Sequence, residues 1–269
     1  MSSALAHETP VRDSVLSLTG VTKRFGAVQA LTDVHLDVAP GEVVALVGDN
    51  GAGKSTLVKI ICGVYQPDQG QISLDGAQVS VGGPRQAQHL GIATVFQDLA
   101  LCDNLDVVAN LFLGQEHHRS YLLNEIQMET EAWRLLRSLS AKIPSVRIPI
   151  AGLSGGQRQT VAIARSLVGK PKVVLLDEPT AALGVAQTAE VLNLVERLRE
   201  QGLGVILVSH NMADVQAVAD RICVLRLGRN AAEFRVEDAT TEQLVAAITG
   251  ASDNVVSARM SRKDGDGNV

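Results

Sequence analysis

Short hydrophobic runs recur along the chain and predict strands of two kinds. Val15–Leu18 and Val34–Val38 alternate apolar and polar residues, as strands with one exposed face do. Unbroken apolar runs predict strands of the second kind, over residues 42–47, 92–96, 173–176 and 204–209. Segments with helical spacing separate these runs, over residues 56–62, 84–91, 158–167, 187–201 and 212–220. The alternation of strands with helices predicts an α/β fold whose core sheet is mainly parallel.

The strand pattern stops between Asp98 and about Gly152. Residues 107–113 and 124–139 have helical spacing there, and Asn124 can cap the second helix. We therefore expect one domain over residues 14–250 with an inserted helical subdomain at about 98–155.

The remaining segments complete this organisation. We expect a turn at residues 23–31, a hairpin about Gly228 and a last helix that Thr241 caps. His117 and His118 are expected in a solvated loop. The polar ends of the chain, residues 1–13 and 251–269, lack any period and are expected to be disordered.

The composition narrows the class of protein. The chain of 269 residues is 46% hydrophobic but 3% aromatic, so its core must be mostly aliphatic, which suits a parallel sheet covered by helices. A net charge of −5 provides no basic field for nucleic acid. Cys62, Cys102 and Cys223 are expected to be buried, reduced thiols. Neither a membrane span nor a signal peptide is recognisable, so we expect a cytoplasmic protein that needs a partner for any role at a membrane.

The strongest candidate for chemistry is Gly48–Ser55, which matches G-x-x-x-x-G-K-[ST] between a strand and a helix. Its glycines allow main-chain N–H groups to surround phosphate, and the helix N-terminus adds positive potential. Lys54 would reach the β- and γ-phosphates, and the Ser55 hydroxyl would ligate Mg²⁺. The glycine spacing excludes the dinucleotide motif, and a plain glycine-rich turn is the alternative. The predicted nucleotide-binding residues are Gly48, Asp49, Asn50, Gly51, Ala52, Gly53, Lys54, Ser55 and Thr56.

Two carboxylates follow the strand at 173–176. Open α/β sheets place their ligands at the carboxyl ends of strands, where Asp177 and Glu178 lie. Asp177 fits a carboxylate that organises Mg²⁺, and Glu178 fits a general base that activates water. A surface acidic pair at a strand end is the alternative.

A second candidate anion site is Leu153–Gln157, in which Ser154 precedes Gly155 and Gly156 at the start of a predicted helix. A hydroxyl, bare main-chain amides and a helix N-terminus all favour an anion. One nucleotide does not need two such sites on one chain. The economical arrangement is a dimer in which Ser154, Gly155, Gly156 and Gln157 of each copy face the nucleotide on the phosphate loop of the other.

These motifs, in this order, resemble the ATP-binding subunits of ABC transporters over about residues 14–235. The resemblance implies a P-loop NTPase fold with an N-terminal antiparallel β subdomain and an inserted α-helical subdomain. It implies ATP and Mg²⁺ as ligands, with Ser55, Gln97 and Asp177 around the metal. It further implies that Phe25 stacks on adenine, that His210 contacts the γ-phosphate and that Gln97 senses the metal and the attacking water. Core packing remains the alternative for Phe25, and a plain residue at the start of a helix is the alternative for His210.

One departure from the family matters. Members often have Ser-Ala-Leu-Asp where this chain has Ala-Ala-Leu-Gly at 181–184, so Gly184 replaces an aspartate that links one phosphate loop to its dimer partner. This puts the usual coupling across the dimer in doubt, but not nucleotide binding. The variant is similar to the carbohydrate-uptake branch, and to ribose-, xylose- and especially fructose-type importers.

The resemblance predicts an ATPase at the cytoplasmic face of the inner membrane that drives import of a monosaccharide. Its expected partners are a second copy of itself, a separate membrane permease, and indirectly a periplasmic or extracellular sugar-binding protein. Three alternatives remain: an exporter or another transporter class, a soluble ABC ATPase acting on nucleic acid or ribosomes, and a non-hydrolysing regulatory module. The acidic net charge disfavours nucleic acid, and an intact Glu178 and His210 disfavour the regulatory module.

Overall fold

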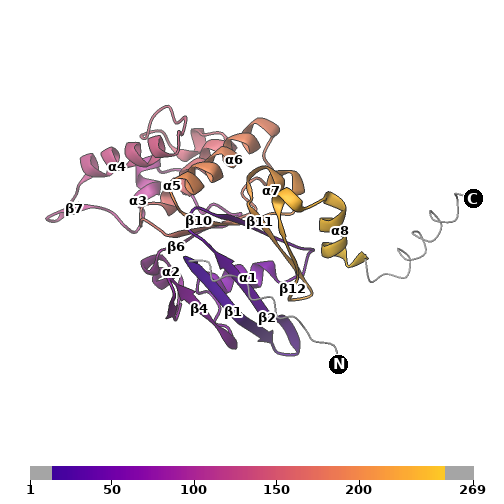
Figure 1. Ribbon diagram of the computed structural model, residues 1–269. Helices are drawn as coiled ribbons and strands as arrows, with labels where there is room; N and C mark the ends of the chain where they lie inside the picture. Colours follow the sequence, from indigo (N-terminus) through magenta and orange to yellow (C-terminus); the bar gives the residue numbers. More distant parts are fainter. Residues whose placement is uncertain (1–13, 252–269) are drawn as a thin grey trace, which may run out of the picture.

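A six-stranded sheet forms the centre of the protein, in a computed structural model that describes residues 14–251 (Figure 1). Its strand order is β12-β11-β3-β10-β9-β6, and β12 alone runs antiparallel to its neighbour. The strands are β3 (Val43–Val47), β6 (Ile92–Val95), β9 (Val173–Asp177), β10 (Gly204–Val208), β11 (Arg221–Arg226) and β12 (Arg229–Arg235). The predicted mainly parallel core sheet is confirmed. The disorder expected for residues 1–13 and 251–269 concerns segments outside the described residues, apart from Ala251.

An antiparallel sheet lies against one side of the core, in the order β2-β1-β4-β5. Its strands are β1 (Leu16–Phe25), β2 (Val28–Val38), β4 (Gln69–Leu74) and β5 (Ala77–Val79). The turn expected over residues 23–31 was wrong in extent, because Lys23 pairs with Leu31 and Phe25 with Val28. Only Gly26 and Ala27 turn the chain, and Gly26 has the left-handed φ of 57° that glycine adopts easily.

Eight α-helices and two short 3₁₀ helices occupy the described part of the chain. They are α1 (Lys54–Ile61), α2 (Pro84–Leu90), α3 (Val107–Phe112), α4 (Glu125–Ser138), α5 (Gly155–Ser166), α6 (Val185–Glu200), α7 (Met212–Val218) and α8 (Thr241–Thr249), with 3₁₀ turns at Ile150–Gly152 and Val236–Asp238. The N-cap of α8 is Thr240 rather than Thr241, because the Thr240 side chain accepts the amide of Gln243. Asn124 caps α4, as predicted.

The segment between β6 and α5 contains α3 and α4, as expected, but also a small hairpin that the sequence did not indicate. Its strands, β7 (His118–Arg119) and β8 (Leu122–Leu123), are too short to show a period, and the hairpin projects from the body of the molecule (Figure 1). The solvated loop expected for His117 and His118 was wrong for His117. The His117 ring packs edge-on against Phe112, with ring centroids 5.1 Å apart.

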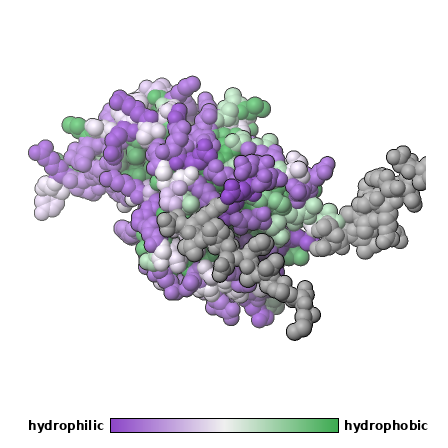
Figure 2. Space-filling view, viewed as in Figure 1, coloured by the Kyte–Doolittle hydropathy of each residue, from purple (hydrophilic) through white to green (hydrophobic). Residues whose placement is uncertain are grey.

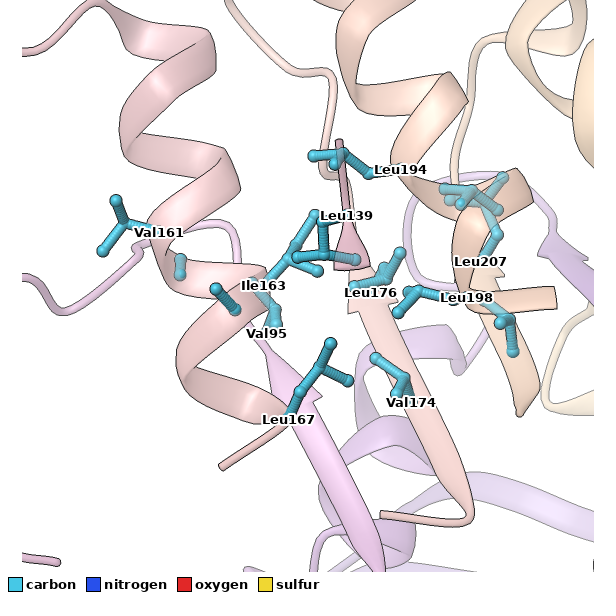
Figure 3. Packing of buried hydrophobic residues seen from close by; sticks show 14 of the residues in the cluster. Val95, Leu139, Val161, Ile163, Leu167, Val174, Leu176, Leu194, Leu198 and Leu207 are labelled. Atoms are coloured by element: carbon cyan, nitrogen blue, oxygen red, sulfur yellow. The ribbon is translucent and has the colours of Figure 1, made fainter. Parts of the chain in front are cut away.

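Two apolar cores lie on opposite faces of the six-stranded sheet, because side chains alternate along each strand. Val174 and Leu176 of β9 face the layer of helices α3 to α8, whereas Val173 and Leu175 face α1, α2 and the antiparallel sheet. Figure 3 shows the first core, where Ile163 of α5 and Leu198 of α6 meet the strands.

The surface is mostly polar over the face shown in Figure 2, and apolar residues gather near α8. Among residues 14–251, no helix is both long enough and apolar enough to cross a bilayer. Cys62 and Cys223 are buried, and burial raises the pKa of both thiols, that of Cys223 to about 12. The expectation of burial was wrong for Cys102, which is partly exposed.

Candidate functional site

The predicted catalytic residues meet at one edge of the central sheet. Strands β3, β10, β9 and β6 are parallel neighbours, with Val208 opposite both Leu46 and Asp177, and Leu176 opposite Val95. Their carboxyl ends therefore lie side by side. The phosphate loop follows β3, His210 follows β10, Glu178 follows β9 and Gln97 follows β6. This is the edge where open α/β sheets bind ligands.

The phosphate loop has the backbone that its glycines were predicted to provide. Gly48, Gly51 and Gly53 have φ values of 151°, 80° and 106°. A Cβ on Gly48 would lie 2.2 Å from the Leu225 carbonyl oxygen, so β11 leaves no room for a side chain there. The Ala52 carbonyl accepts the Gly228 amide at 3.0 Å, which ties the loop to the β11–β12 turn.

The charged and hydroxyl groups of the loop are placed for a phosphate chain. Lys54 Nζ donates to the carbonyl oxygens of Gly48 at 2.6 Å and Asp49 at 3.1 Å, so the ammonium spans the loop. Ser55, in the first turn of α1, is exposed, as are Asn50 and Gly51. Such a loop opening onto a helix N-terminus attracts anions.

Asp177 ends β9 and is partly buried. Burial raises the pKa of its carboxyl above the ordinary value, the negative charge of Glu178 raises it further, and Lys54 and Lys59 oppose this. A partly desolvated carboxylate at the strand end beside the phosphate loop is suited to a divalent cation.

Glu178 adopts an uncommon backbone conformation, with φ of 50°. Its amide donates to the Val208 carbonyl at 2.9 Å, which fixes the turn against β10. Its carboxylate is mostly buried, and its Oε2 lies 2.8 Å from His210 Nδ1. The His210 ring itself is 75% exposed, so its other nitrogen faces solvent. Thr180, two residues later, donates its hydroxyl to Asp214 at 2.6 Å and anchors the following segment to α7.

Gln97 and Phe25, which were also predicted to belong to the site, are both exposed. Gln97 lies two residues after the end of β6. Phe25 ends β1 with 40% of its surface exposed, which makes a face available for stacking and argues against full core packing. Its ring packs edge-on against Tyr65, with centroids 5.0 Å apart, and Lys23 Nζ lies 5.5 Å from its centroid.

The second predicted anion site begins α5. Ser154 is the N-cap and accepts the Gln157 amide, while Gln157 Oε1 accepts the Ser154 amide at 3.0 Å. Gln157 also donates to the Lys142 carbonyl at 3.0 Å, which holds the motif against the chain after α4. None of these hydrogen bonds involves the phosphate loop, and Ser154 and Gly155 are exposed.

Gly184 is the N-cap of α6, and its amide donates to Gln187 Oε1 at 3.3 Å. Its φ of −75° is ordinary for any residue, and a Cβ would meet nothing within 4 Å. The departure from the family's aspartate therefore has no steric cause in the described residues.

The residues present fit a nucleotide with its metal, because the loop amides, Lys54, Ser55 and Asp177 offer the donors and oxygens that a metal-bound triphosphate takes. No pattern in the sequence indicated a role for Tyr65, which packs edge-on against Phe25, or for Arg165, which lies within α5. Arg165 could have been noticed because it follows four apolar residues, 161–164, within a predicted helix.

Comparison with known proteins agrees with the resemblance to ATP-binding subunits of ABC transporters. The family described as ABC transporter matches residues 31–181. The xylose/arabinose import ATP-binding protein of Sulfolobus acidocaldarius is 44% identical over 87% of this chain and 94% of its own length. The fructose import ATP-binding protein of Rhizobium meliloti is 42% identical over 90% of this chain and 96% of its own length.

Solved structures agree on the fold. A nucleotide-free ATP-binding cassette from an ABC transporter has a TM-score of 0.76 and 26% identity, covering 88% of this chain and 95% of that one. A dimeric ATP-binding cassette in a post-hydrolysis state, bound to ADP and Pi, has a TM-score of 0.68 and 28% identity, covering 82% and 98%.

Proposed function

This chain belongs to the ABC transporter family as an ATP-binding, ATP-hydrolysing subunit, and we propose that it drives import of a monosaccharide through a separate membrane permease. One observation carries the proposal: Lys54, Asp177, Glu178 and His210 come together at one sheet edge in a chain that resembles sugar-import subunits over most of its length. Xylose, fructose and ribose are the candidate sugars. Another substrate class or export is the competing function.

Each residue has one task in the proposed reaction. The loop amides and Lys54 bind the phosphates of ATP, and Phe25 stacks on the adenine. Ser55, Gln97 and Asp177 would hold Mg²⁺, which would neutralise charge on the β- and γ-phosphates. Glu178 accepts a proton from the attacking water, and its contact with His210 Nδ1 at 2.8 Å keeps the carboxylate oriented. His210 presents its exposed nitrogen to the γ-phosphate.

The site requires a second copy of the chain. Ser154, Gly155, Gly156 and Gln157 start a helix, and the hydrogen bonds of Ser154 and Gln157 involve no residue of the phosphate loop of the same chain. We infer that they close over ATP bound to the partner copy, so that a homodimer forms two composite sites. The dimeric structure of a related cassette supports this arrangement.

The permease would dock beside the loop after Gln97. A cleft of about 280 Å³ lies there, lined by residues of α2, β6 and α5 and by Leu113 and Gln115, which follow α3. We infer one ATPase domain over residues 14–250, in which a helical subdomain at about 98–155 receives the permease. The subunit would thus be held at the cytoplasmic face of the membrane. A sugar-binding protein outside the membrane would deliver the substrate.

Reconstitution tests this function. The subunit and the permease encoded with it are placed in liposomes with ATP inside and a radiolabelled sugar outside, together with its binding protein. We expect ATP-dependent uptake of one of the three sugars, and none with Lys54→Met, which lacks the ammonium on the phosphate loop. Lys172→Met, which removes a surface ammonium paired with Asp75, should leave uptake unchanged. Uptake that continues with Lys54→Met would contradict the proposal.

A further inference from the structure

Phe25, the proposed platform for the adenine, lies at an exposed hairpin end. It pairs with Val28 next to the β1–β2 turn, and 40% of its surface is exposed. Val28 is 65% exposed, and Gly26 beside Phe25 is exposed as well. An aromatic ring in such a position can occupy several rotamers unless another side chain restrains it. Its orientation for stacking therefore depends on contacts from elsewhere in the chain.

The ring of Tyr65 supplies one such contact. It packs edge-on against the Phe25 ring, with centroids 5.0 Å apart and ring planes inclined at 67°. Tyr65 is half-buried and packs against the core that α1, α2 and the antiparallel sheet share. Edge-to-face pairs favour particular mutual orientations of two rings, beyond the effect of the area that they bury. Tyr65 therefore restrains the orientation of the Phe25 ring.

Helix α1 fixes Tyr65 in turn. The Tyr65 amide donates to the Lys59 carbonyl at 3.0 Å, and Lys59 Nζ lies 5.6 Å from the centroid of the Tyr65 ring. Lys59 belongs to α1, which begins at Lys54 of the phosphate loop. The helix whose N-terminus is proposed to bind the phosphates therefore also positions, at its other end, the ring that restrains Phe25.

Lys23 and Asp68 add a second restraint. Lys23 Nζ lies 5.5 Å from the centroid of the Phe25 ring, and it donates to Asp68 Oδ1 at 2.7 Å. Asp68 also accepts the amide of Arg24, the residue before Phe25, at 2.7 Å. These two hydrogen bonds hold the pKa of the Asp68 carboxyl below its ordinary value, so the carboxylate stays charged. The segment 65–68 therefore restrains both the Phe25 ring and the main chain beside it.

We propose that Tyr65 is a positioning residue for nucleotide binding, whose ring holds Phe25 in the orientation that stacks on the base. The proposal rests on the function proposed above and adds a residue that acts on the base through Phe25. A ring that is ordered before binding loses no further rotational freedom when the base arrives, and this raises the affinity for the nucleotide. Chemistry at the phosphates does not depend on it.

Calorimetric titration of the purified subunit with ADP, which cannot be turned over, tests this inference. Tyr65→Leu keeps an apolar side chain against the core but removes the aromatic edge. We expect its Kd for ADP to rise about fivefold. Its KM for ATP should rise alike, while kcat at saturating ATP stays unchanged. Tyr65→Phe should bind as the wild type does, because the ring remains. Tyr121→Leu, the same change at a tyrosine that is 99% exposed, is the matched control and should change neither constant.

A double variant distinguishes action through Phe25 from a general loss of packing. Phe25→Ala alone should raise the Kd for ADP about tenfold or more, as loss of a stacking ring does. Adding Tyr65→Leu to Phe25→Ala should weaken binding no further. The same fivefold loss with and without Phe25 would overturn the positioning role.

Two further outcomes separate the levels of inference. If Phe25→Ala weakens ADP binding but Tyr65→Leu does not, the proposed function stands and the role of Tyr65 is wrong. If the wild-type subunit binds neither ADP nor ATP, the proposed function is wrong, and the role of Tyr65 with it.

Discussion

The Glu178 carboxylate lies 2.8 Å from His210 Nδ1, although the two residues follow different strands. Glu178 leaves β9 with a left-handed φ of 50°, and its amide is held by the Val208 carbonyl of β10. Strained residues of this kind persist where surrounding structure holds them, often at functional sites. Strand β10 therefore holds Glu178 in two ways. Its Val208 carbonyl accepts the Glu178 amide, and His210, which follows the strand, contacts the Glu178 carboxylate.

Two glycines of the phosphate loop should respond differently to alanine. Gly48→Ala puts a Cβ 2.2 Å from the Leu225 carbonyl oxygen at φ of 151°, whereas Gly51→Ala meets nothing within 4 Å at φ of 80°. We expect Gly48→Ala to lower the free energy of unfolding by about 3 kcal/mol and Gly51→Ala by about 1 kcal/mol. Urea unfolding measures both. Equal losses would mean that β11 does not constrain the loop as described.

The buried carboxyl of Asp177 should make stability depend on pH. Its pKa is raised in the folded protein, so between the ordinary value and the raised one the native state binds more protons than the unfolded chain. The ionised Asp177 carboxyl therefore lowers the free energy of unfolding at pH values above its raised pKa. This destabilisation disappears as pH falls from the raised pKa towards the pKa of the unfolded chain. Nucleotide-free Asp177→Asn should therefore be more stable than wild type at pH 7.5, and the difference should shrink towards pH 4. A difference that grew on acidification would contradict this environment for Asp177.

Ser154 caps α5, and it is proposed to contact the nucleotide of the partner copy; substitutions can separate the two roles. Ser154→Ala removes the N-cap of α5 and should cost about 1 kcal/mol of unfolding free energy. Ser154→Asp keeps a capping oxygen but places negative charge where the partner's γ-phosphate is proposed to lie. We expect it to retain stability near wild type while abolishing the ATP-dependent dimer, measured by light scattering. A normal dimer with Ser154→Asp would exclude Ser154 from the composite site.

Substitutions at Gly184 test whether an aspartate at this position would strengthen the proposed dimer. Because a Cβ there meets nothing within 4 Å and φ is −75°, Gly184→Asp should fold with a stability change of only a few tenths of a kcal/mol. The restored carboxylate should raise the fraction of ATP-bound dimer, and Gly184→Ala, which adds no carboxylate, should not. Sedimentation at fixed ATP distinguishes them. If Gly184→Asp and Gly184→Ala dimerise equally, a carboxylate at position 184 has no role at this interface.

The sequence allowed the core sheet and the catalytic edge to be predicted because each strand there is a continuous apolar run followed at once by its functional residue. Asp177 and Glu178 follow 173–176 in this way, as Lys54 follows 42–47 by way of the glycine loop. The β7–β8 hairpin could not be predicted, since two-residue strands have no period. Residues 23–31 were misjudged because both strands are exposed where they meet at Gly26 and Ala27, so that no alternation of buried and exposed positions marks Arg24, Phe25, Val28 and Gln29 as strand. The hydrogen bond of Arg165 to the Ala100 carbonyl depends on a loop 65 residues away, which no local pattern reports.

Glu178 is proposed as the general base of an ATPase whose two sites form only in a dimer. The most direct test is the Glu178→Gln variant. Its phosphate release is measured in the presence of ATP and Mg²⁺, and its mass in solution distinguishes a dimer from a monomer. The amide keeps the shape of the side chain but cannot accept the proton of the attacking water. We predict loss of turnover by at least about 100-fold, together with a stable dimer that retains ATP. Hydrolysis at the wild-type rate, or a monomer at saturating ATP, would contradict the account.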